Sequence, residues 1–72
     1  MTNEYEAKAE ELRVLLYRTS YDSVRDLLEA GDTPDHVRTD LLHGVPDDPS
    51  DEAATTKRAA VEDALAGRQP RW

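Results

Sequence analysis

The chain has 72 residues, no cysteine and a formal net charge of −7, from 16 Asp and Glu against nine Lys and Arg. This length allows one domain with a small core, and the lack of cysteine excludes disulfides, thiol nucleophiles and cysteine-type zinc sites. The acidic balance opposes binding to nucleic-acid phosphates and to anionic membrane surfaces.

The first half of the chain carries the signals of two helices. Asn3 can cap a first helix over about residues 4–19, with Glu6 in capping-box position. Ser20 can cap a second helix, which Gly31 would end. At about 100° per residue each helix has one apolar face, which we expect to line the core. That face consists of Tyr5, Ala9, Leu12 and Leu16 in the first helix and of Tyr21, Val24, Leu27 and Leu28 in the second.

Two further helices are predicted in the second half. Thr33 and Pro34 can serve as the cap and first residue of a third helix, which Gly44 would end. Residues 45–49 hold two prolines and two aspartates, which indicates a loop. Ser50 can cap a fourth helix, which we expect to be weakly docked because its inner face is mostly alanine. The inner residues are Val37, Leu41 and Leu42 in the third helix and Ala53, Ala60, Val61, Ala64 and Leu65 in the fourth.

These signals predict an all-α fold, a small bundle of three core helices plus a fourth, alanine-rich helix, joined by short loops. Residues 1–67 would form the single helical domain and residues 68–72 a short C-terminal tail. No segment alternates apolar and polar residues with β-branched enrichment, so no strand is expected.

The sequence contains no recognisable catalytic motif. Each of the three glycines follows a predicted helix end, which leaves none for a phosphate-binding loop. Ser20 and Ser50 are explained as caps, and no strand-to-helix elbow is predicted that would expose a nucleophile. We therefore expect a protein that is not an enzyme and that uses no cofactor.

The residues most like metal ligands are His36, Asp40 and His43, which lie within about 60° of one another on the third helix. Two imidazoles and a carboxylate suit a divalent metal ion. However, one helix face seldom supplies three ligands to one ion. A solvated helix face is the favoured interpretation, and no metal site is predicted.

Two alternatives involve nucleic acids. The helices on either side of Gly31 resemble a helix-turn-helix, which would imply a DNA-binding regulator. The second of them carries Arg38 as its only fixed cation, so we expect no direct contact with nucleic acid. The net charge also permits an acidic inhibitor that mimics nucleic acid on a nucleic-acid-binding protein. The interleaving of opposite charges fits local support of the helices better.

Apolar residues outside the predicted inner faces are the main functional signal. Val14 lies about 180° and Tyr17 about 120° from the Tyr5–Leu16 face, so both would project outward unless a later segment covers them. Trp72 and Arg71 are residue types enriched in binding hot spots, although this tail could also fray or fold onto the core. Val14, Tyr17, Arg71 and Trp72 are the predicted partner-binding residues.

The sequence therefore favours a small, acidic, non-enzymatic accessory or regulatory protein that binds a protein partner or itself. The first eleven residues are polar and acidic, unlike a signal peptide, and no apolar run approaches the length of a membrane span. A cytoplasmic location without membrane contact is expected.

Overall fold

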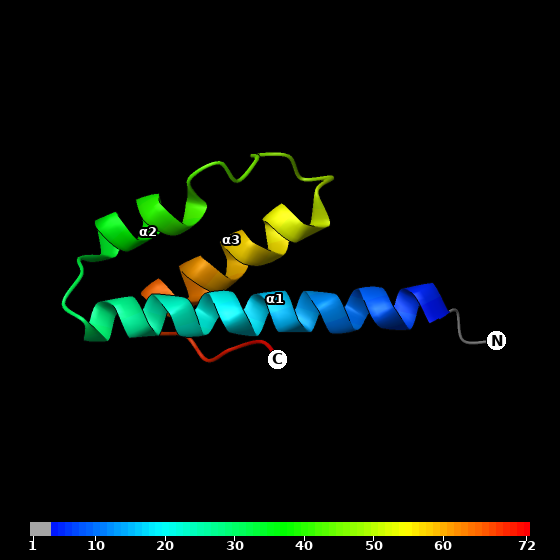
Figure 1. Cartoon of the computed structure of the whole chain (residues 1–72), viewed down its shortest axis with the longest axis horizontal. Helices are drawn as coiled ribbons and strands as arrows, with labels where there is room; N and C mark the ends of the chain where they lie inside the picture. The colour runs from blue at the N-terminus through cyan, green and yellow to red at the C-terminus, as the bar shows by residue number, and fades with distance from the viewer. Residues whose placement is uncertain (1–3) are drawn as a thin grey trace.

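The structure, a computed structural model, describes residues 4–72. Over these residues the chain forms three α-helices and no strand (Figure 1): α1 at Glu4–Glu29, α2 at Pro34–Leu42 and α3 at Glu52–Leu65. The all-α prediction is confirmed. The prediction of four helices is wrong, because the first two are a single helix. The predicted cap Asn3 lies outside the described residues.

α1 continues through the predicted break at Ser20. Tyr17, Ser20, Tyr21 and Val24 recur at the spacing of one helix face, and all four are buried. Ser23 Oγ donates to the carbonyl of Thr19 at 2.9 Å, a bond that leaves the helix intact. Residues 4–29 contain neither glycine nor proline that would end the helix, so Ser20, which could cap a helix, lies inside one.

α1 ends and α2 begins as the sequence predicts. Gly31 has φ +101°, and the amide of Asp32 donates to the carbonyl of Leu27 at 3.0 Å, which closes the last turn of α1. The side chain of Thr33 accepts from the amide of His36 at 3.3 Å, and Pro34 is the first residue of α2.

The cap of α3 is Asp51 rather than the predicted Ser50. The Asp51 side chain accepts from the amide of Ala54 at 3.0 Å. Ser50 instead donates both its amide and its hydroxyl to Asp48 Oδ1, at 2.9 and 2.8 Å. The helix therefore starts one residue later than predicted, because Ser50 belongs to the preceding turn.

The core lies between α3 and the second half of α1, with α2 closing one end. α3 contributes the most buried residues of the described helices, so the prediction that it is weakly docked is wrong. The alanines of α3 allow its backbone to approach that of α1 closely, so a few large side chains are enough to fill the space between the two helices. The buried cluster consists of Tyr17, Tyr21, Val24, Val37, Ala60, Val61 and Ala64, with Leu27, Leu28, Leu41, Leu42, Ala59 and Leu65 packed against it.

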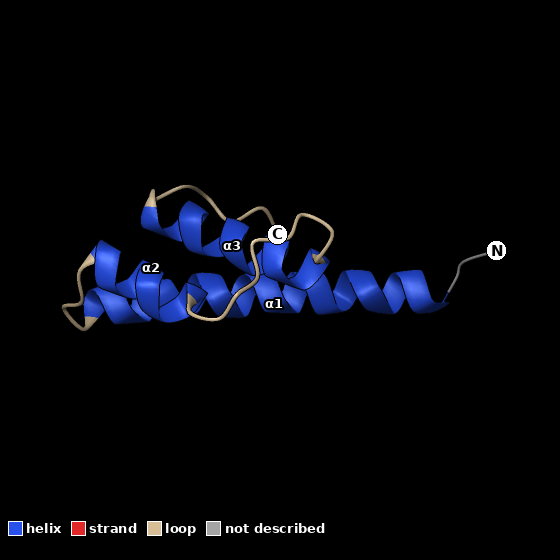
Figure 2. Ribbon diagram, turned by 90° about the horizontal axis from the view of Figure 1, so that it is seen from above, coloured by secondary structure: helices blue, strands red, loops and turns tan. Residues whose placement is uncertain are grey.

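The first turns of α1 extend beyond the other helices (Figures 1 and 2). The described part of the molecule measures 47 × 23 × 15 Å, and α1, with 26 residues, has a length of about 39 Å. Tyr5 is 85% and Leu12 61% exposed, so their predicted burial is wrong. The reason is geometric. Tyr17, Tyr21 and Val24 set the core face of α1, and Tyr5 and Leu12 lie about 130–150° around the helix from it.

Candidate interaction surface

Tyr17 is a core residue. It is fully buried, which corrects the prediction that it projects outward as a partner-binding residue. Val14 is half-buried, so it is not freely exposed either. The C-terminal segment, residues 66–72, turns back along α1 (Figure 1) and covers Tyr17, with the Trp72 ring centroid 5.0 Å from that of Tyr17. The sequence allowed this alternative, but the register of one helix alone cannot show which segment will cover it.

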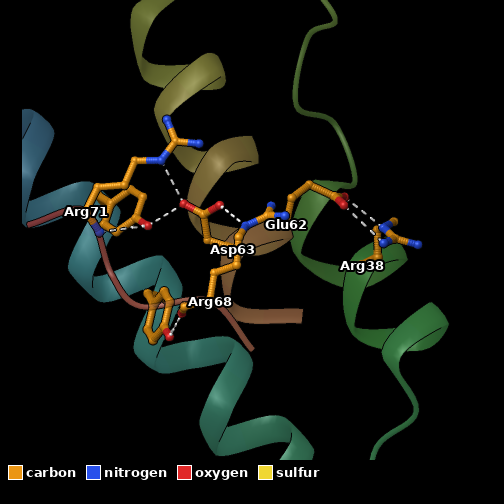
Figure 3. A network of polar contacts seen from close by, with 7 residues as sticks. Arg38, Glu62, Asp63, Arg68 and Arg71 are labelled. Atoms are coloured by element: carbon orange, nitrogen blue, oxygen red, sulfur yellow. Dashed lines mark hydrogen bonds and ion pairs between the residues drawn. The ribbon is translucent and has the colours of Figure 1, made fainter. Parts of the chain in front are cut away.

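Asp63 holds the C-terminal segment to the core (Figure 3). Its side chain is only 3% exposed. The hydroxyl of Tyr17 donates to Asp63 Oδ2 at 2.5 Å. Arg68 Nε donates to Oδ1 at 2.8 Å, and Arg71 Nε donates to Oδ2 at 2.9 Å. Three donors therefore compensate the desolvation of one carboxylate.

Gly67 directs the chain so that these arginines can reach Asp63. It has φ +72°, and the amide of Arg68 donates to the carbonyl of Asp63 at 2.9 Å, a helix-ending geometry that favours glycine. Farther on, the amide of Arg71 donates to the Tyr17 hydroxyl at 3.2 Å, while the Tyr21 hydroxyl donates to the carbonyl of Arg68. Residues far apart in sequence are thus joined through two tyrosines of α1.

Trp72 lies against the core and also reaches solvent. Its ring meets Tyr17 edge to face, with centroids 5.0 Å apart and an interplanar angle of 78°. It is still 42% exposed. Arg71 and Trp72, both predicted as partner-binding residues, therefore have structural roles in this chain, and only part of Trp72 is accessible to a partner.

Burial and the hydrogen bonds between them shift the pKa values of Tyr17 and Asp63. Burial, followed by the hydrogen bond to Asp63, raises the pKa of Tyr17. Burial alone would raise the pKa of Asp63, but the hydrogen bonds from Tyr17, Arg68 and Arg71 outweigh it and lower that pKa. The sequence contained a signal for this site, since Asp63 lies three residues after Ala60 on the edge of the apolar face of α3.

The exposed apolar side chains gather on the first half of α1. Leu15 is 63% exposed, in addition to Tyr5 and Leu12, while Leu16 is half-buried. Ala9 is exposed between Tyr5 and Leu12. We call Tyr5, Ala9, Leu12, Leu15 and Leu16 the apolar face of α1. Apart from Leu15, which flanks it, it is the face that the sequence predicted as core, so the sequence identified the apolar residues but not their exposure.

Two grooves border this region. One, of about 260 Å³, lies between the apolar face of α1 and the start of α3, and it is lined by Ala9, Leu12, Arg13, Leu16, Glu52, Ala53 and Thr56. The other, of about 320 Å³, lies on the other side of the first turns of α3 and reaches Arg71 and Trp72. Both are lined by Arg13 and Glu52, whose side chains are joined by a 3.1 Å ion pair.

The residues considered as metal ligands do not converge. Among residues 4–72, no group of three His, Asp or Glu side chains is arranged to hold a metal ion. His36 and Asp40 are exposed on α2, and His43 is exposed at its C-cap. His36 Nδ1 lies 3.3 Å from Asp32 Oδ1, so its nearest acidic neighbour is in the turn before α2.

Arg38, the cation of the helix-turn-helix alternative, is engaged within the chain (Figure 3). Its Nε and Nη2 donate to the two carboxylate oxygens of Glu62 in α3, at 2.8 and 3.1 Å. The hydrogen bonds to Glu62 raise the pKa of this guanidinium. Arg38 therefore joins α2 to α3, and contact with a phosphate would have to compete with this bidentate pair.

Comparison with known proteins finds no matching family model, no similar curated protein and no similar solved structure. Within residues 4–72, none of the helices combines the length and the apolar character needed to cross a bilayer.

Proposed function

We propose that this chain is a non-enzymatic accessory or regulatory protein that acts by protein–protein interaction. The observation that carries the proposal is the apolar face of α1. Leu12 and Leu15 are more than half exposed, and Tyr5 is 85% exposed. Exposed, contiguous apolar surface on a soluble domain is typical of interaction sites.

The neighbouring groove supports the same location. Ala53 and Thr56 of α3 form one wall and Leu12 and Leu16 of α1 the other, so an inserted side chain would contact two elements at once. Tyrosine and leucine side chains at such a site can exclude water from a partner. The partner-binding residues are therefore proposed to be Tyr5, Leu12, Leu15 and Leu16, in place of Val14 and Tyr17, with Trp72 at the edge of the second groove.

The test compares proteins captured from the native host by the tagged chain and by its Leu12→Ser variant. We expect Leu12→Ser to fold normally and to lose a partner, because truncating an interface anchor weakens binding by more than about 1 kcal/mol. Ala7→Ser, on the opposite side of α1, is the matched control and should keep that partner. Equal capture by all three proteins would contradict the proposal.

A further inference from the structure

The apolar face of α1 has the spacing of a coiled-coil seam. Tyr5, Ala9, Leu12 and Leu16 are separated by four, three and four residues, the alternation of the two apolar positions in a heptad. These positions form a narrow stripe along α1, beside the buried face that contacts α3. A seam of this kind matches a second helix with an equivalent stripe.

We propose that the occupant of this face is a second copy of this chain, paired antiparallel through the first half of α1. The inference rests on the proposed function and names the partner. A two-fold axis between Ala9 and Leu12 would bring Leu12 of each copy opposite Ala9 of the other. The same register brings Tyr5 opposite Leu16 of the second copy, at the groove beside Ala53. Large side chains thus meet small ones or enter a groove, as close packing requires.

The charges beside the stripe are complementary in this arrangement. Glu6 and Arg13 flank it on one side, and Lys8 and Leu15 on the other. A two-fold axis that reverses the helix direction sets each flank against the same flank of the second copy. Glu6 then faces Arg13 of the second copy, with an offset along the axis of only about 3 Å. The stem of Lys8 lies over Leu15 of the second copy.

Parallel pairing would reverse this complementarity. It would place Lys8 beside Arg13 of the second copy on both sides of the seam, and like charges across a helix interface are unfavourable. Arg13 already contacts Glu52 at 3.1 Å, but a guanidinium has five N–H donors and can serve two carboxylates. The flanking charges therefore select the antiparallel direction.

The small core of the single chain is an independent reason to expect self-association. The largest fully buried side chains among the described residues are Tyr17, Val24, Val37 and Val61. Chains of this size without disulfides or metals are commonly stabilised by oligomerisation. The stripe adds leucine and tyrosine surface that the single chain leaves in solvent.

The experiment is a charge-reversal pair, measured by sedimentation equilibrium on the purified chain. Wild type should show a concentration-dependent mass between monomer and dimer. Glu6→Arg and Arg13→Glu, each alone, should weaken association about tenfold, since both symmetry-related pairs become repulsive. An equal mixture of the two variants should restore it, because each copy then supplies what the other lacks.

The control pair is Asp22→Arg with Arg25→Glu, which carries the same charge changes on α1 away from the seam. Mixing this pair should give no comparable gain. Leu12→Ser should weaken association of the otherwise native chain by at least about tenfold, with circular dichroism confirming that it folds.

Three results would overturn the inference. They are a monomeric wild type at concentrations up to about 1 mM, association that Leu12→Ser leaves unchanged, and a charge-reversed mixture that associates no better than its components. If the chain is monomeric but Leu12→Ser still fails to capture a protein that wild type captures, the identification of the partner as a second copy is wrong and the proposed function stands. If neither experiment responds to Leu12→Ser, both fail.

Discussion

At the scale of single residues, Asp63 joins α3 to α1 and to the C-terminal segment. It is a buried carboxylate whose oxygens accept hydrogen bonds from α1 and from the C-terminal segment. Among the described residues, every buried polar side-chain atom has a hydrogen-bond partner. Because a buried donor without an acceptor is costly, removing the Asp63 carboxylate affects Tyr17 as well as the two arginines.

The first prediction concerns pH. The pKa of Asp63 is lowered by folding, so its contribution to stability is present above about pH 4 and is lost as pH falls through its folded-state pKa. The pKa of Tyr17 is raised, so its contribution is present below about pH 10 and is lost as pH rises through its folded-state pKa. Denaturant unfolding across pH should therefore show stability falling on both sides.

Two variants separate the loss of stability at acidic pH, the acid limb, from the loss at alkaline pH, the alkaline limb. Asp63→Asn should be less stable at neutral pH by about 1–3 kcal/mol and should lose less stability on acidification than wild type does. Tyr17→Phe should flatten the alkaline limb. An acid limb as steep in Asp63→Asn as in wild type would show that other carboxylates cause it, for example Asp48, whose pKa the hydrogen bonds from Ser50 lower.

The second prediction compares Tyr17 with Leu12. Tyr17→Ala removes a fully buried ring and should cost about 3–5 kcal/mol of unfolding free energy. Leu12→Ala should cost at most about 0.5 kcal/mol in the monomer, since Leu12 is 61% exposed. Denaturant melts in dilute solution, where self-association is negligible, measure both. Equal losses would mean that Leu12 is covered within a single chain.

At the scale of elements, the sequence predicted helix content and most helix ends but not the continuity of α1. Gly31, Thr33 and Pro34 act locally, through backbone geometry and capping, so their effect could be predicted. Ser20 can cap a helix or continue one, and the choice depends on whether Tyr17 and Tyr21 pack against α3, which is a tertiary contact. The exposure of Leu12 depends likewise on where α3 begins.

The third prediction tests this continuity. If Ser20 were a helix cap, Ser20→Ala would cost about 1 kcal/mol. Ser20 lies inside α1, where alanine has the higher helix propensity, so we expect Ser20→Ala to be neutral or stabilising by up to about 0.5 kcal/mol. Asp51→Ala, at the cap of α3, is the control and should cost about 1 kcal/mol. A matching loss in Ser20→Ala would contradict an uninterrupted α1.

At the scale of the whole molecule, the dominant property is the charge of −7 on 72 residues. Compaction brings like charges together, and pairing two copies brings them closer still. Salt bridges oppose this repulsion, but the Arg13–Glu52 and Arg38–Glu62 pairs are partly or largely exposed, so solvent and salt screen them and they contribute little to stability. The Asp63 contacts are buried on the carboxylate side and are screened less.

The last prediction follows from weighing these terms. Raising the salt concentration shortens the screening length from about 10 Å at 0.1 M to about 3 Å at 1 M, which weakens the long-range repulsion more than it weakens the close, buried contacts. We therefore expect the Tm to rise with sodium chloride and the dimer fraction to rise with it. Choline chloride at equal ionic strength should give the same increase, since screening does not depend on the cation.

The double variant Asp35→Asn, Asp40→Asn, altered at exposed α2 positions, should show a smaller rise of Tm with salt because it carries less charge. A Tm that falls as salt rises would mean that exposed ion pairs outweigh the net repulsion, and the charge of this chain would then stabilise its fold.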